Sequence, residues 1–181
     1  VVDITPGYDL LKAEHFAEIL RAFPDIRIVF LMRDPVNRAL SAMGMIYRNL
    51  FAKTGLRKAQ FVQDIIQGKA QHRHLIIRSS YQDTIRELEA TVPKDRILYL
   101  FYEDLFTDLS IKKLCQFIDI PFKKGDYERV VFAGKGPKFR NPALRRYLHR
   151  ELAGVYPAMK EKFGEDLPEA WSATQLSETG R

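Results

Sequence analysis

The residues best suited to chemistry lie in the segment 33–41 (RDPVNRALS), which follows a short apolar run and leads into a helical pattern. Asp34 is a good N-cap residue, and Pro35 fits the first position of a helix. A helix N-terminus offers unpaired N–H groups and a partial positive charge, and Arg33 adds a planar fork of donors for phosphate oxygens. The segment therefore predicts a phosphate-binding site. Ser41, about two turns into the helix, can add a hydroxyl to it.

Two other segments carry residue types that suit the binding of a nucleotide. In the segment 132–139 (FAGKGPKF), glycines on both sides of Lys135 let the backbone approach an anion closely. Tyr102 follows a second short apolar run, and an aromatic side chain at the end of a strand can stack on a base. These residues extend the predicted site from a phosphate to a larger ligand.

Taken in order along the chain, these segments resemble the sulfotransferases that use 3′-phosphoadenosine 5′-phosphosulfate (PAPS), with a nearer likeness to the bacterial and glycan-type members. In the family pattern RDPxxRAxS, the first Arg and the Ser hold the 3′-phosphate of the donor, which implies this role for Arg33 and Ser41. The segment 3–8 (DITPGY) is similar to the E-K-[ST]-P-x-Y segment of the glycan-modifying members. This likeness implies that Asp3 is the catalytic base that takes the acceptor's proton, although Ile4 stands where the family has Lys.

The resemblance includes two further parts of the family pattern. The segment 97–105 (ILYLFYEDL) is similar to the family's strand and YEDL motif, which implies that Tyr102 approaches the adenine. Lys135 and Gly136 match the late Lys-Gly loop that closes over the donor phosphates. A proline stands where an Arg often follows in the family, so Lys138 is expected to substitute for that Arg.

Short apolar runs alternate with helical patterns along the chain. Such alternation predicts an α/β fold of three layers, α/β/α, with a central parallel sheet whose carboxyl edge carries the site. The resemblance implies that this is the P-loop nucleoside-triphosphate-hydrolase-like fold of the sulfotransferases. We expect a sulfotransferase domain over residues 1–170 and a polar tail over 171–181. The expected strands are 1–5, 27–33 and 96–102, and the expected helices are 10–22, 35–51, 60–67, 80–91, 110–118 and a long one after Pro142.

The family also has a loop that cradles the 5′-phosphosulfate, and this sequence contains no counterpart of it. The nearest candidate, Lys53-Thr54-Gly55, follows a helical pattern and not a strand. In the family that loop precedes the acidic strand, so we expect it upstream of Val1, with this chain as the C-terminal portion. Without the loop, we expect this chain alone to be incomplete for activity.

The composition narrows the choice of partners but does not identify one. The 181 residues include 29 Lys and Arg against 23 Asp and Glu, a net charge of +6 that suits a polyanionic ligand. No apolar run approaches the roughly 18 residues of a membrane span. The single cysteine, Cys115, fits a buried apolar side chain, and the compartment stays open, with the cytoplasm favoured for a bacterial protein.

The resemblance thus implies an enzyme that moves a sulfuryl group from PAPS to a hydroxyl or amine on a glycan, lipid, small molecule or peptide. No metal is expected, because Lys, Arg and Ser side chains can neutralise the donor, and no nucleic-acid partner is expected. One alternative is a nucleotide or small-molecule kinase of the same fold group, which would use ATP and magnesium. The other is a non-catalytic anion- or RNA-binding module, which would show steep salt dependence and little nucleotide selectivity.

Overall fold

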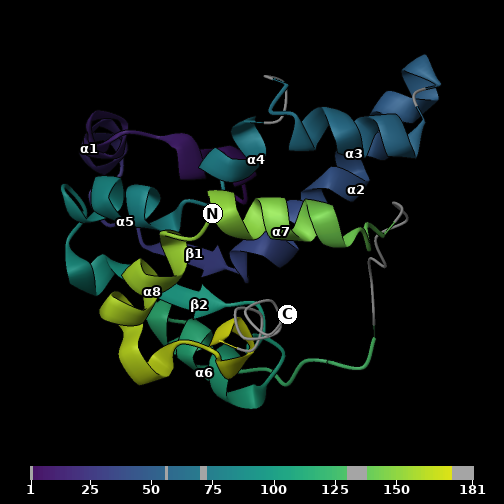
Figure 1. The fold of residues 1–181 in the computed structure, drawn as a ribbon. Coiled ribbons are helices and arrows are strands. Elements are labelled where there is room, and N and C mark those ends of the chain that lie inside the picture. The colour runs from purple at the N-terminus through teal and green to yellow at the C-terminus, as the bar shows by residue number, and fades with distance from the viewer. Residues whose placement is uncertain (1, 56, 70–72, 130–137, 173–181) are drawn as a thin grey trace. The chain divides into compact units, whose positions relative to one another are not determined.

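The computed structural model describes residues 2–55, 57–69, 73–129 and 138–172 (Figure 1). The chain divides into two compact units, one of Val1–Met32 with Tyr81–Arg129 and one of Arg33–Ser80 with Val130–Arg181. Each unit is built from two stretches of sequence, and the boundary between Met32 and Arg33 falls directly before the segment 33–41 that carries the predicted phosphate site.

A parallel pair of strands forms the centre of the first unit. Strand β1 (Ile28–Met32) pairs with β2 (Ile97–Phe101) in a register that runs from Ile28 opposite Ile97 to Met32 opposite Phe101 (Figure 1). The N–H of Tyr102 extends the ladder by donating to the carbonyl of Met32 at 2.8 Å. Both runs are short and rich in β-branched and aromatic residues, and the predicted parallel sheet is confirmed for these two strands.

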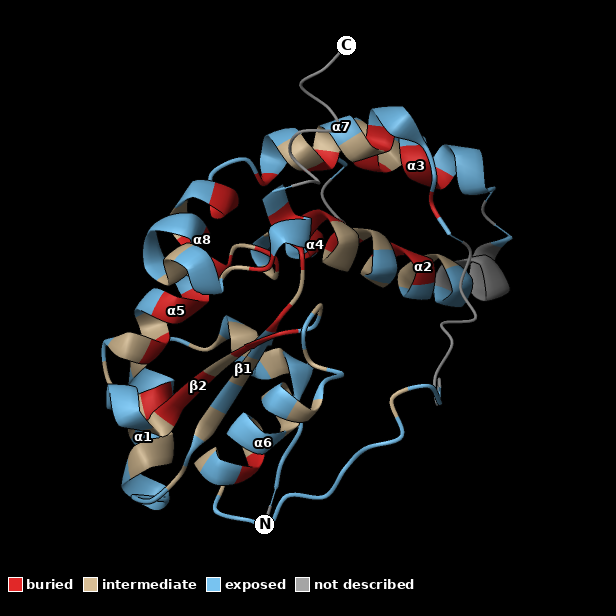
Figure 2. Cartoon of the chain, turned by 90° about the horizontal axis from the view of Figure 1, so that it is seen from below, coloured by how far each residue is buried: buried red, intermediate tan, exposed pale blue. Residues whose placement is uncertain are grey.

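Helices cover both faces of this sheet. On one face, α1 (Ala13–Ala22) and α5 (Tyr81–Glu89) bury Phe16 and Leu88 against the strands. On the other, α6 (Asp108–Phe117) contacts β2 and buries Cys115. Figure 2 shows α1 and α6 on opposite sides of the strands, with β2 buried over most of its length. The predicted arrangement of a parallel sheet between helical layers is thus present in this unit.

The strand expected at residues 1–5 is not found in the part of the segment that the structure describes. Residues 2–5 have no regular structure, and the side chains of Val2 and Ile4 are 77% and 87% exposed. A strand is stable only when a neighbour pairs with its backbone, and among the described residues none does so here. Instead the chain turns at Thr5 into a 3₁₀ helix, η1 (Pro6–Leu10).

The second unit is helical. Its helices are α2 (Pro35–Thr54), α3 (Lys58–Ile66), α4 (Arg73–Ile77), α7 (Pro142–Glu151) and α8 (Val155–Phe163). The helix expected after Pro142 is interrupted at residues 152–154, where Gly154 is a weak helix former and precedes α8. Leu152, Val155 and Trp171 are buried in this unit. The short helix α4 was not predicted.

Among the residues that the structure describes, no helix is both long and apolar enough to cross a membrane. Within the same part of the chain, no group of three or more His, Cys, Asp or Glu side chains is placed to hold a metal ion.

Candidate functional site

The N-terminus of α2 is the centre of the candidate site in the second unit. Asp34 precedes the helix, is only 1% exposed, and accepts the backbone N–H of Asn37 on Oδ1 at 2.8 Å. Pro35 occupies the first helical position, where its missing N–H leaves no donor unsatisfied. The predicted start of the helix and the predicted role of Asp34 as its N-cap are therefore confirmed.

Tyr156 reaches this helix end from α8. Its hydroxyl donates to Oδ2 of Asp34 at 3.1 Å and accepts the backbone N–H of Val36. The residue is 4% exposed. Burial, followed by the negative charge of Asp34 and the hydrogen bond to it, raises the pKa of Tyr156, so the hydroxyl keeps its proton and remains a donor to the carboxylate.

These contacts occupy the N–H groups at the start of α2. Pro35 has none, Val36 uses the Tyr156 hydroxyl, and Asn37 uses the Asp34 carboxylate. The N–H of Arg38 donates to the Asp34 carbonyl at 2.8 Å, in the regular helical pattern. The sequence argument that this helix end offers free N–H groups to a phosphate is therefore wrong, because side chains of the protein itself already cap them. What remains for an anion is the helix dipole and the neighbouring side chains.

Arg33 and Ser41 are the two side chains that this segment was predicted to offer a phosphate. Arg33 directly precedes Asp34 and is half-buried, whereas Ser41 lies on α2 and is exposed. Seven positions separate Ser41 from Asp34, so these two residues fall on the same face of the helix. The two predicted ligands, Arg33 and Ser41, lie in one continuous segment of the second unit.

The remaining polar residues of the segment 33–41 bind other helices of the unit. Arg145 on α7 donates to Oδ1 of Asn37, from Nη2 at 2.9 Å and from Nη1 at 3.4 Å. Arg38 donates from Nη1 to the carbonyl of Leu75 and to Oγ of Ser79, each at 3.2 Å. Sequence analysis missed these contacts. The polar residue types at positions 37 and 38 of the motif were a signal that the two side chains have hydrogen-bond partners.

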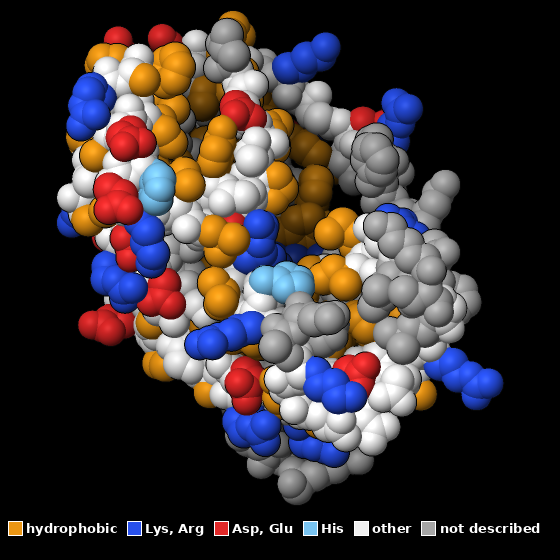
Figure 3. Space-filling view, turned by 90° about the horizontal axis from the view of Figure 1, so that it is seen from above, with side chains coloured by type: hydrophobic (Ala, Val, Ile, Leu, Met, Phe, Trp, Pro, Cys, Tyr) orange, Lys and Arg blue, Asp and Glu red, His pale blue; other side chains and the backbone are white. Residues whose placement is uncertain are grey.

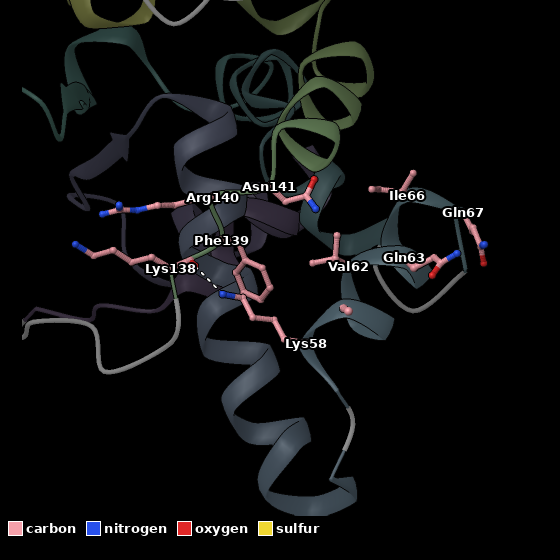
Figure 4. A pocket seen from close by; sticks show the side chains of 10 residues that line it. Lys58, Val62, Gln63, Ile66, Gln67, Lys138, Phe139, Arg140 and Asn141 are labelled. Carbon is pink, nitrogen blue, oxygen red and sulfur yellow. Dashed lines mark hydrogen bonds between the residues drawn. The ribbon is translucent and has the colours of Figure 1, made fainter.

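A groove of about 940 Å³ lies beside Lys138, between α3 and the residues that lead into α7 (Figure 4). Lys58 donates to the carbonyl of Lys138 at 2.9 Å, and its ammonium lies 5.0 Å from the centroid of the Phe139 ring. None of the ten side chains that line the groove is acidic. They are Lys58, Ala59, Val62, Gln63, Ile66, Gln67, Lys138, Phe139, Arg140 and Asn141.

Lys138 is the only predicted residue of the late loop that the described ranges include. It is exposed, at the edge of this groove. Lys135 and Gly136 lie outside the described residues.

In the first unit, Asp3 is exposed and has two hydroxyl partners. Its Oδ1 accepts the hydroxyl of Thr5 at 2.9 Å, and its Oδ2 accepts the hydroxyl of Tyr8. The hydrogen bond from Tyr8 and then that from Thr5 lower the pKa of Asp3, while the same contact raises the pKa of Tyr8. Asp3 is therefore ionised at neutral pH and can accept a proton, but both donors make it a weaker base than a lone carboxylate.

Tyr102 lies at the carboxyl end of β2, as predicted. It is 40% exposed, and its ring makes an edge-on contact with Phe106 at a centroid distance of 5.4 Å. Met32 and Phe101 are partners in the ladder, so Arg33 and Tyr102 are the residues that next follow β1 and β2 in the sequence.

Charged residues of α5 form ion pairs with one another and with the residue that precedes α1. Lys12 contacts Glu87 at 3.2 Å, and Arg86 contacts Asp83 at 3.0 Å. Figure 3 shows acidic and basic side chains intermixed at the left of the view, the side on which Figure 1 places these helices. The positive net charge of the protein is not gathered into a basic patch there.

The sequence profile of the sulfotransferase family matches residues 7–124, more than half of the chain. The protein therefore belongs to the sulfotransferase family, and the resemblance identified from its motifs is confirmed. Membership implies a P-loop-like fold. Arg33, Ser41 and Tyr102 lie inside the matched region, whereas Asp3, Lys135, Gly136 and Lys138 lie outside it. No curated protein gives a significant match to this chain.

Proposed function

We propose that this protein takes part in the transfer of a sulfuryl group from PAPS to a hydroxyl or amine acceptor. The observation that carries the proposal is that Arg33 directly precedes the capped start of α2 and Ser41 lies on that helix, in a chain that belongs to the sulfotransferase family. A guanidinium and a hydroxyl in one short segment fit a phosphate group, and ATP has no phosphate at the 3′ position to use them.

In the proposed reaction, the acceptor oxygen or nitrogen forms a bond to sulfur while the bond from sulfur to the 5′-phosphate oxygen breaks. Asp3 receives the acceptor's proton, and adenosine 3′,5′-bisphosphate leaves. Arg33 and Ser41 hold the 3′-phosphate, the ring of Tyr102 faces the adenine, and Lys135, Gly136 and Lys138 bind donor phosphates. As in phosphoryl transfer, positioning and charge stabilisation would supply most of the rate enhancement.

The groove beside Lys138 supports an acceptor that carries negative charge. Lys58 and Arg140 contribute positive charge to it, and Gln63 and Gln67 offer amide groups for hydrogen bonds. We place the acceptor, or an anionic group attached to it, in this groove.

The test is calorimetric binding of adenosine 3′,5′-bisphosphate to the natural full-length protein, with 5′-AMP and ATP with magnesium as comparison ligands. Loss of a charge-assisted hydrogen bond costs about 1.5–3 kcal/mol, so Arg33→Ala should weaken binding of the bisphosphate roughly tenfold to a hundredfold. Arg48→Ala is the matched control, because Arg48 is an exposed arginine on the same helix. The affinity of Arg48→Ala for the bisphosphate should equal that of the unmodified protein.

Each outcome separates the candidate functions. A preference for the 3′,5′-bisphosphate that disappears in Arg33→Ala supports the sulfotransferase site. Tighter binding of ATP with magnesium would favour the kinase alternative. Equal and strongly salt-dependent binding of all three nucleotides would favour the anion-binding module.

A further inference from the structure

The polar side chains of the segment 33–41 have two different roles in the proposed site. Arg33 and Ser41 are the residues that we propose to contact a phosphate. Asp34, Asn37 and Arg38 bind α8, α7 and α4 respectively, so three helices hold the first turns of α2. The position of the proposed ligands therefore depends on residues that come much later in the sequence.

Tyr156 makes the most specific of these contacts. Its single hydroxyl joins the Asp34 carboxylate, at 3.1 Å, to the backbone N–H of Val36. One side chain of α8 thus fixes both the cap and the first free N–H of α2. Because Arg33 is the residue directly before Asp34, any movement of the cap also moves the backbone from which the Arg33 side chain starts.

The ring of Tyr156 is held independently of its hydroxyl. It stacks on His149 at a centroid distance of 6.0 Å and meets Trp171 edge-on at 6.4 Å. A phenylalanine at position 156 would keep these ring contacts and would lose only the bridge to α2. The substitution therefore separates packing from the positioning of the helix end.

We propose that Tyr156 is a positioning residue of the phosphate site, which holds the first turn of α2 so that Arg33 and Ser41 address the 3′-phosphate together. This inference rests on the proposed function. Tyr156 itself does not touch the ligand in this account, because its hydroxyl is engaged by Asp34 and Val36. Arg145 also helps to hold the first turn of α2, because it donates a hydrogen bond to Asn37.

The experiment compares Tyr156→Phe with Tyr99→Phe in the natural full-length protein. Tyr99 is a matched control, because its hydroxyl also donates to a carboxylate, that of Glu89 at 3.0 Å, in a partly buried setting of the first unit. For each variant, calorimetry measures the ratio of the affinity for adenosine 3′,5′-bisphosphate to that for 5′-AMP. Thermal unfolding is recorded for both variants alongside.

Misplacement of a binding group by about 1 Å is sufficient for large losses, so we expect the ratio to fall about tenfold in Tyr156→Phe. The ratio should not change in Tyr99→Phe, even though both variants lose some thermal stability. An unchanged ratio in Tyr156→Phe, with the unmodified protein still selective, would overturn the positioning role alone. An equal fall of the ratio in both variants would also overturn it, since general destabilisation would then be the cause. Absence of selectivity in the unmodified protein would instead refute the proposed function.

Discussion

Replacing Asp34 by alanine should destabilise the protein by more than the loss of an ordinary helix cap. The carboxylate accepts the N–H of Asn37 at 2.8 Å and the hydroxyl of Tyr156 at 3.1 Å. Loss of an N-cap costs about 0.5–2 kcal/mol. A buried hydroxyl left without its acceptor costs a further 1–3 kcal/mol or so. The free energy of unfolding should therefore decrease by about 2–4 kcal/mol in Asp34→Ala.

The decrease can be measured by urea unfolding and by the midpoint of thermal unfolding, which should drop by roughly 5–15 °C for a chain of this size. Asn141→Ala is the matched control, because Asn141 caps α7 through one hydrogen bond to the N–H of Leu144 at 3.0 Å and is exposed. The Asn141→Ala substitution should decrease the free energy of unfolding by only about 1 kcal/mol.

A double variant tests the cause of the difference. If the unsatisfied Tyr156 hydroxyl accounts for the additional loss, then adding Tyr156→Phe to Asp34→Ala should cost nothing further or should restore some stability. The reasoning would be refuted if Asp34→Ala cost no more than Asn141→Ala. It would also fail if the two substitutions at positions 34 and 156 were simply additive.

The remaining predictions concern one group in each unit. Tyr8→Phe should raise the pKa of Asp3 towards its ordinary value of 3.8, as followed by NMR titration of the carboxyl carbon, because it removes the main donor to that carboxylate. The folded pKa of Asp3 lies below the unfolded one, so its contribution to stability is present above pH 3.8 and is lost as the pH falls through the folded pKa. An Asp3 pKa that did not move in Tyr8→Phe would contradict the hydrogen bond. Phe139→Ala should decrease the free energy of unfolding by about 3–5 kcal/mol, since the ring is 7% exposed and packs on Phe61 and Tyr47. Phe106→Ala, at a ring that is 52% exposed, should cost far less in the same urea measurement.

The sequence predicted those elements whose signals are local. The apolar runs at β1 and β2 are short and rich in branched and aromatic residues, and each is stable because the other pairs with it. The start of α2 follows from Asp34 and Pro35 alone, which combine a cap with the residue best suited to the first helical position. Local signals of this kind need no knowledge of the rest of the chain.

The failures occurred where the structure depends on a distant partner. The apolar pattern of residues 1–5 resembles that of a strand, but a strand also needs a neighbour, and the sequence does not show whether one is present. The break between α7 and α8 combines a local signal, Gly154, with the burial of Leu152 and Val155 on either side of it. The partners of the motif lie 122 residues away for Tyr156 and 108 for Arg145, beyond the reach of any pattern argument.

The same distinction explains why the predicted way of binding phosphate has to be revised. From the sequence, α2 looked like a helix whose free N–H groups would hold an anion directly. In the structure, Asp34 and Tyr156 occupy those groups, and a carboxylate stands at the helix end where an anion was expected. The carboxylate offsets part of the helix dipole, so the attraction for a phosphate must come mainly from the guanidinium of Arg33. A site of this kind should depend more steeply on one arginine than a loop of backbone N–H groups would, because Arg33 supplies a charged donor whereas Ser41 supplies a neutral one.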